Sequence, residues 1–291
     1  MNAHTINEAA ASSAAAAAPT LAGSPGKPPE AWRRSKTLGL ALVVPVLLLA
    51  LWWGLVIWTG TTLVPLPQTV AIMIWDFAFG GIYDDAYSAT LLPHLLASTR
   101  RVFLGFGLAA LAGVPLGLML GRSRLLRMLL DPILSLLRPV PVTAWLPLAM
   151  IFFGLGSNSA IFLVFLGAFY PIMLNTVFGV RAVDVRLFEA AAMLGCTGTA
   201  QFRSVTLRGA LPSIFNGLRL GLSFAWILIV VGEMTGVQMG LGAVIMDART
   251  LSRTDLVITG MIFIGLAGFF CDRLIVLINN RLMRWSPQHH V

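Results

Sequence analysis

Residues of the types that do chemistry are sparse in this sequence and lie far apart. None of the four histidines stands at metal-ligand spacing to a carboxylate or a thiol, and none lies beside a serine or cysteine that it could activate. The only lysines, Lys27 and Lys36, do not belong to a Gly-x4-Gly-Lys-Ser/Thr loop of the kind that cradles nucleotide phosphates. We therefore expect a chain that is not an enzyme and that holds neither a metal nor a cofactor.

The segment 181–212 carries more signals of local structure than a connecting loop needs. Asp184 is placed to cap a helix that Gly195 ends in the left-handed conformation, and Thr199 is placed to cap a second short helix. These helices carry Glu189, Ala190, Ala191, Phe202 and Arg203. Two short helices joined by a glycine turn form a protrusion that can dock in a groove of another protein.

The elements that position this segment are helices that span a membrane. Hydrophobic residues make up 57% of the chain and charged residues 11%, with a mean hydropathy of +0.85, whereas soluble domains carry about a quarter charged residues. Long apolar runs predict an all-α, polytopic membrane helix bundle. Its six transmembrane helices are expected at 37–60, 100–121, 133–154, 159–180, 213–233 and 256–280.

The order of these runs predicts a single membrane domain between two tails. The predicted parts are a disordered cytoplasmic tail 1–36, a first transmembrane helix 37–60, an extracytoplasmic segment 61–99, a core domain 100–284 with five transmembrane helices and the cytoplasmic loop 181–212, and a cytoplasmic tail 285–291. Lysine and arginine gather on the side that this topology makes cytoplasmic, as the positive-inside rule expects.

The basic charge of the chain follows from this topology. The net charge of +8 is scattered singly and in pairs between apolar runs, so we expect no nucleic-acid partner. Arg100 and Arg101 stand against the rule. Either they reach the outer headgroups, or their helix begins earlier, near Ser88, and they face protein or an aqueous vestibule. Cys196 and Cys271 are expected to be free thiols.

The segment 181–212 also resembles the signature of the permease subunits of bacterial ABC importers. The matching residues are Glu189, Ala190, Ala191 and Gly195, followed by Val205 and Leu207, with Arg208 where the family usually has proline. The segments 136–176 and 217–236 and the final RWSP are similar to the branch that contains nitrate, sulfonate, taurine and bicarbonate permeases. The resemblance runs from about Leu66 to Pro287.

This resemblance implies a type I ABC importer permease fold in a bacterial inner membrane, with both termini in the cytoplasm. The two loop helices would be the coupling helix that seats in cytoplasmic ATP-binding cassette subunits, and an extracytoplasmic binding protein would deliver the solute. The implied coupling residues are Glu189, Ala190, Ala191, Gly195, Phe202 and Arg203. The implied cargo is nitrate or an organosulfonate such as an alkanesulfonate or taurine.

The chain itself contains no evident source of energy for uphill transport. Since it lacks a phosphate-binding loop, ATP hydrolysis is expected on a separate subunit. A six-helix chain gives half of a two-fold pathway, which predicts a homodimer in the lipid bilayer. The alternative is an ion-coupled secondary transporter or a channel without an ATPase partner, which would need ionisable residues near the middle of the bilayer, where Asp272 is the nearest candidate.

Three polar residues in the predicted spans are candidates for the pathway or its gate. Glu233, at the outer end of a span, either gates the path or contacts the binding protein, or else pairs structurally with an arginine. Asn175 either lines the pathway or links two helices. Arg219 either helps an anion leave toward the cytoplasm or anchors its helix on the basic side of the membrane.

Overall fold

The computed structural model describes residues 30–61, 63–83 and 85–282, with side chains from residue 43 onward. Most of the predicted tail 1–36 and all of 285–291 therefore lie outside the described residues. The chain forms two compact units, Met1–Trp58 and Thr59–Val291. The described part of the first unit lies within one helix, α2 (Glu30–Thr59), which contains Pro45.

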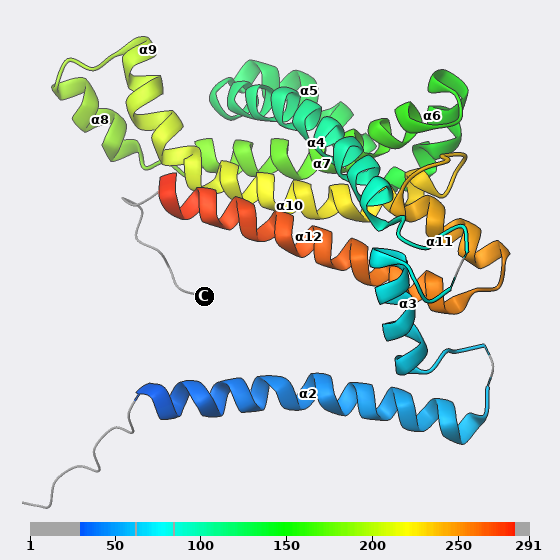
Figure 1. The fold of residues 1–291 in the computed structure, drawn as a ribbon. Helices are drawn as coiled ribbons and strands as arrows, with labels where there is room; N and C mark the ends of the chain where they lie inside the picture. The colour runs from blue at the N-terminus through cyan, green and yellow to red at the C-terminus, as the bar shows by residue number, and fades with distance from the viewer. Residues whose placement is uncertain (1–29, 62, 84, 283–291) are drawn as a thin grey trace, which may run out of the picture. The chain divides into compact units, whose positions relative to one another are not determined.

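In the second unit, all the secondary-structure elements among the described residues are helices (Figure 1). In chain order these are α3 (Pro67–Phe79), α4 (Leu91–Arg122), α5 (Arg124–Leu137), η1 (Val142–Trp145), α6 (Leu146–Phe153), α7 (Ser157–Arg181), α8 (Val185–Met193), α9 (Gly198–Gln201), the π-helical η2 (Phe202–Leu207), α10 (Arg208–Glu233), α11 (Leu241–Thr250) and α12 (Thr254–Leu282). The all-α fold class is confirmed.

Helix α7 is the centre of the second unit, since α4 and α10 both pack closely against it. Glycines allow this approach. A Cβ atom at Gly117 of α4 would lie 2.6 Å from the Cβ atom of Thr176, and one at Gly221 of α10 would lie 2.8 Å from the side chain of Ile172. The small residues therefore bring helices of one chain together, which is how helices associate where lipid removes the hydrophobic drive.

Four helices are long and apolar enough to cross a membrane, namely α4, α7, the continuous helix 198–233 and α12. A fifth crossing exists if the bent pair Arg124–Leu137 and Val142–Phe153 counts as one span, and the apolar part of α2, Val43–Thr59, is shorter. The count of six is therefore reached only when both of these are included.

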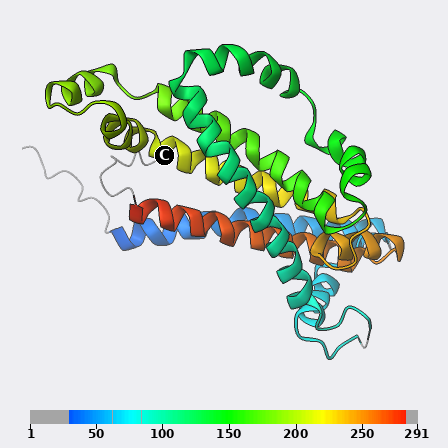
Figure 2. The same ribbon diagram turned by 90° about the horizontal axis from the view of Figure 1, so that it is seen from above.

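The span predicted at 133–154 is not one continuous helix. The chain bends by 88° between α5 and the helices that follow, and Figure 2 shows α5 and α6 as an arch beside α4 and α7. The bend falls at Pro139 and Pro141, which lack the N–H group that a helix needs and disfavour helical geometry in the residue before them. Most of the residues between the spans predicted at 100–121 and 133–154 lie in α5.

Two other boundaries differ from the prediction. Helix α4 begins at Leu91 rather than at residue 100, as in the second of the two options for the paired arginines. The helix expected to start at Pro212 is continuous from Gly198, with this proline inside α10. The turn before this proline is π-helical, at Phe202–Leu207.

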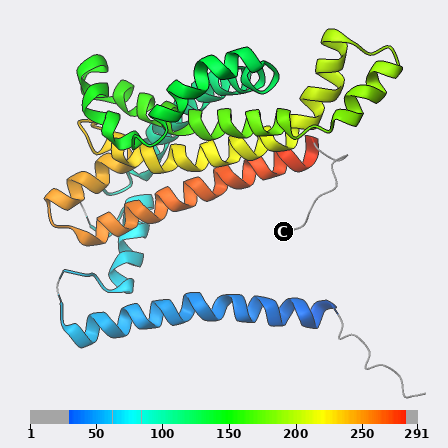
Figure 3. The same cartoon turned by 180° about the vertical axis from the view of Figure 1, so that it is seen from behind.

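The bundle has two distinct ends, seen from both sides in Figures 1 and 3. Helices α8 and α9 project at one end, which we call the α8 end, and α11 lies at the other, which we call the α11 end. The segment that joins α3 to α4 folds around Asp76, whose carboxylate accepts hydrogen bonds from the N–H groups of Ile82 at 2.8 Å and Tyr83 at 2.9 Å and from Ser88 Oγ at 2.6 Å. The Ser88 hydroxyl and these backbone groups lower the pKa of the Asp76 carboxyl from its usual value, against the opposing effect of burial.

Candidate functional site

The protrusion at the α8 end is built by local capping. Asp184 Oδ1 accepts a hydrogen bond from the N–H of Arg186 at 2.9 Å and so caps α8, as predicted. Gly195 has a φ of 74°. The Cys196 N–H donates to the Ala191 carbonyl at 2.9 Å, which completes a Schellman motif. The predicted cap at Thr199 is wrong, because α9 begins one residue earlier, at Gly198.

Two contacts fix the protrusion to itself and to the bundle. Gln201 Nε2 donates to the carbonyl of Phe188 at 3.0 Å, which joins α9 to α8. The guanidinium of Arg122, at the end of α4, lies over the ring of Phe202 at 5.5 Å from its centroid. The protrusion is therefore in contact with α4 and continuous with α10, two of the three helices of the central packing.

The outer surface of the protrusion is a mixture of charged, small and apolar side chains. Among the six predicted coupling residues, Glu189, Ala190, Gly195 and Arg203 are exposed, and Ala191 and Phe202 are half-buried. Met193 is 87% exposed and Leu194 is 86% exposed at the glycine turn. Exposed apolar side chains at the tip of a rigid helix favour a protein partner. Sequence reasoning missed these two, although their position just before Gly195 was a signal.

At the α11 end, Glu233 is a buried and fully paired carboxylate. It is 1% exposed, and its Oε1 accepts a hydrogen bond from Arg101 Nη1 at 2.6 Å. Its Oε2 accepts from Ser98 Oγ at 2.7 Å and from the N–H of Gly242 at 3.0 Å. Of the alternatives predicted for Glu233, the structure shows the pairing with an arginine, Arg101.

Arg101 ties two further segments to this carboxylate. It donates from Nη1 to the Met239 carbonyl at 2.6 Å and from Nε to Ser157 Oγ at 3.0 Å. The network thus joins α4, the start of α7, the end of α10 and the turn before α11. Arg101 faces protein while Arg100 is exposed, which explains how two adjacent arginines stand at this end of the chain.

Glycines make room for the network. A Cβ atom at Gly240 would lie 2.4 Å from the Glu233 carboxyl group, so only glycine fits there. The Gly240 N–H donates to His94 Nδ1 at 3.1 Å, and the Leu241 N–H donates to Ser98 Oγ at 2.8 Å. The start of α11 is therefore held against α4 by its backbone.

The other two candidates lie on the faces of α7 and α10 in the half of the bundle toward the α8 end. Asn175 Nδ2 donates to the Pro171 carbonyl at 2.8 Å, and its Oδ1 accepts from Asn216 Nδ2 at 3.3 Å, so it links α7 to α10. Arg219 forms a two-pronged ion pair with Asp272 of α12, from Nε at 2.5 Å and from Nη2 at 2.9 Å. Glu233 does not meet these residues.

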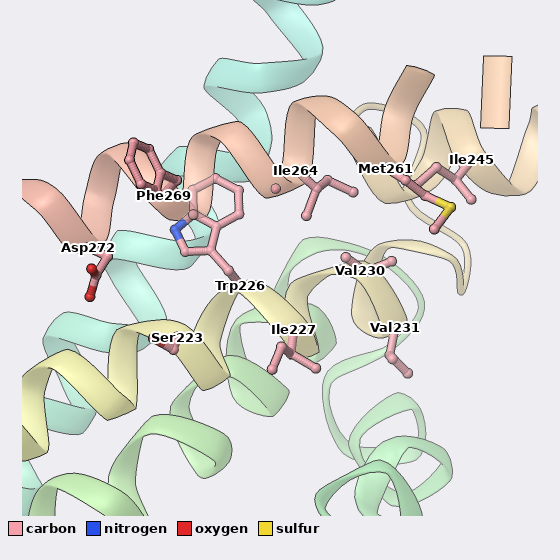
Figure 4. Close-up of a pocket in the computed structure, with 12 residues that line it drawn as sticks. Ser223, Trp226, Ile227, Val230, Val231, Ile245, Met261, Ile264, Phe269 and Asp272 are labelled. Carbon is pink, nitrogen blue, oxygen red and sulfur yellow. The ribbon is translucent and has the colours of Figure 1, made fainter. Parts of the chain in front are cut away.

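A groove of 630 Å³ runs between α10 and α12, with α11 at one end (Figure 4). Asp272 and Ser223 lie at its end toward α8, while Trp226, Ile227 and Phe269 belong to its apolar wall. Among the described residues, no group of three histidine, cysteine or acidic side chains is placed to hold a metal ion.

Helices long and apolar enough to cross a membrane, with a capped protrusion at one end and a buried ion network at the other, define a polytopic membrane protein. The sequence pattern of the binding-protein-dependent transport system inner membrane component matches residues 113–284. The chain belongs to this family, and it is thus an inner membrane component of a transport system.

Individual proteins resemble the chain over most of its length. The taurine transport system permease protein of Escherichia coli (strain K12) is 34% identical over 88% of this chain and 93% of its own length. A nitrate import permease protein of Synechocystis sp. is 32% identical over 84% and 89%. The permease in the solved MetNI methionine ABC transporter has a TM-score of 0.51 at 21% identity, over 65% of this chain and 95% of its own; it supports the type I importer fold.

Proposed function

We propose that this chain is the permease subunit of an ATP-driven importer of nitrate or of an organosulfonate such as an alkanesulfonate or taurine. Its similarity to taurine and nitrate permeases supports this class of cargo. The observation that carries the proposal is the rigid, exposed protrusion of α8 and α9, which has the form of a docking element and lies at one end of the spans. The alternative, a self-powered secondary transporter, has no comparable feature in its favour.

In this proposal each cytoplasmic ATPase subunit binds one protrusion. The contacts are made by Glu189, Ala190 and Arg203 and by the apolar tip, Met193 and Leu194. Gly195 sets the turn, and Ala191 and Phe202 hold the protrusion together from within. Closure of the ATPase subunits on ATP moves the protrusion, and the contact between Arg122 and Phe202 passes that movement to α4.

The remaining parts follow from this orientation. The α8 end lies in the cytoplasm with both termini of the chain, and the α11 end faces an extracytoplasmic binding protein. Two copies form the pathway as a homodimer. Asn175 and Arg219 lie along the pathway, while Glu233 is a positioning residue, because it is buried by its own partners and holds α11 in place.

The test replaces exposed and turn residues of the protrusion. Glu189→Lys reverses a charge on the docking surface, and Gly195→Asp places a side chain at a φ of 74° that side chains rarely adopt. We expect both variants to insert normally and to lose co-purification with the ATPase or ATP-dependent uptake. Arg181→Glu, an equal charge reversal at the exposed end of α7, is the matched control. Unimpaired uptake in both protrusion variants contradicts the proposal.

A further inference from the structure

One face of α10 is exposed in the half toward the α8 end and carries three polar residues together with Leu220, which is 42% exposed. Asn216, Arg219 and Ser223 recur at helical spacing on this face, and the opposite face is buried against α7. The side chain of Arg219 is 51% exposed, and that of its partner Asp272 is 24% exposed. A charged pair of this kind needs water or protein beside it.

Arg219 and Asp272 lie far from the ends of their helices, so contact with water or protein matters more for this pair than it would near a helix end. Arg219 lies eleven residues after the start of α10 and fourteen before its end, or about 16 Å and 21 Å along the axis at 1.5 Å per residue. Asp272 lies ten residues before the end of α12. An arginine can extend toward a headgroup, but an aspartate is too short to do so. A lipid-facing position is therefore costly for Asp272.

The groove beside the pair has a matching chemistry. Its wall is almost entirely apolar, and Asp272 is the only charged residue that lines it. Figure 4 shows Asp272 and Ser223 together at one end, with Ile227, Val230 and Met261 extending away from them. The apolar wall ends at Asp272, and Arg219 lies beside that end, paired with Asp272, without lining the groove itself. An organic ion whose apolar body lies in the groove therefore has its charged head next to the pair.

The pair still has donors to offer such a head. Arg219 uses Nε and Nη2 on Asp272, and its Nη1 group donates to no acceptor among the residues that the structure describes. A guanidinium has five N–H donors in a planar fork that suits sulfonate and carboxylate oxygens. Asp272 neutralises the arginine at the same time, so an anion is held weakly enough to leave again, which conduction requires.

We propose that Arg219, with Asp272 as its counter-ion, is an anion subsite on the transport path, and that the groove between α10 and α12 receives the apolar body of an alkanesulfonate. This inference rests on the proposed function. The competing explanation is that the ion pair only ties α10 to α12.

The subsite can be tested by thiol labelling of the full chain in lipid nanodiscs. In a Cys196→Ser, Cys271→Ala background, Ser223→Cys places a thiol one turn from Arg219. We expect anionic sulfonatoethyl methanethiosulfonate to modify it several-fold faster than the cationic trimethylammonioethyl reagent. Hexanesulfonate should slow this labelling, and nitrate should do so less. The matched control is Leu111→Cys, at an exposed apolar position on α4, which should stay unlabelled.

Two further variants separate the explanations. Arg219→Gln should abolish the preference for the anionic reagent, whereas Asp272→Asn, which removes the counter-ion, should increase it and strengthen protection by hexanesulfonate. A structural tie predicts the same change from both variants, since each breaks the pair. Such a result, a thiol as unreactive as Leu111→Cys, or equal protection by nitrate overturns the inference.

The labelling requires neither the ATPase nor the binding protein. Its outcome is therefore independent of whether Glu189→Lys loses the ATPase, and failure of the subsite can be told apart from failure of the proposed function.

Discussion

Glu233 and Arg101 are charged side chains enclosed among apolar helices, and their partners explain why they are tolerated. Burial of a charge is unfavourable unless the charge is paired and its remaining hydrogen-bonding groups are satisfied. Here the carboxylate accepts from a guanidinium, a hydroxyl and a backbone N–H. The pair fixes where α11 starts, so its loss should be felt beyond the two side chains.

We expect Glu233→Gln to destabilise the chain by about 3 kcal/mol, because removal of one partner leaves the other charge buried and unpaired. The measurement is thermal unfolding of the purified chain in detergent. Arg100→Gln, which changes the exposed neighbour of the buried arginine, is the control and should leave the unfolding temperature almost unchanged. Equal shifts in the two variants would show that the network does not stabilise the fold.

At the scale of elements, the sequence predicts features that depend on neighbouring residues but not contacts between residues far apart in the chain. The Asp184 cap and the Gly195 turn follow from side-chain and backbone preferences within a few residues, and both are present. The break in 133–154 was also local, since Pro139 and Pro141 are visible, but the apolar run hid it. The pairing of Arg101 with Glu233 spans 132 residues, and only the packing of α4 against the end of α10 brings them together.

The segment between α3 and α4 is held in its conformation by hydrogen bonds to the carboxylate of Asp76. Because the pKa of Asp76 is lowered in the folded chain, with its hydrogen bond from Ser88 as the largest cause, the ionised form is the one that stabilises this turn. Its stabilisation is complete above the usual aspartate pKa and is lost as the pH falls through the lower folded value.

Residues 80–90 should therefore become more susceptible to proteolysis only in strongly acidic solution, below about pH 4. Limited proteolysis with an acid-active protease measures this. Asp76→Asn should make the segment susceptible at neutral pH as well and remove the pH dependence, since an amide cannot accept all three bonds equally well. Asp131→Asn, at an exposed aspartate of α5, is the control. A pH dependence that persists in Asp76→Asn would contradict this account.

For the whole molecule, the packing around α7 buries one face of α10 and leaves another face exposed. The sequence predicted the class of fold because apolar length and charge content are global properties. It did not predict which face of α10 would remain polar and uncovered, since that depends on how Gly217 and Gly221 seat the helix against α7. An uncovered polar face in the spans requires a second copy or water beside it.

The charged pairs within the spans bear on how transport is driven. Within the described spans, the buried or partly buried carboxylates Glu233 and Asp272 are each paired with an arginine, Arg101 and Arg219, and they do not form a relay of carboxylates that a proton gradient could drive. The purified chain alone in liposomes should therefore take up no labelled alkanesulfonate under a proton or sodium gradient. Addition of its ATPase subunits, ATP and binding protein should produce uptake, and Glu189→Lys should prevent it. Gradient-driven uptake by the chain alone would mean that its energy source lies within the spans.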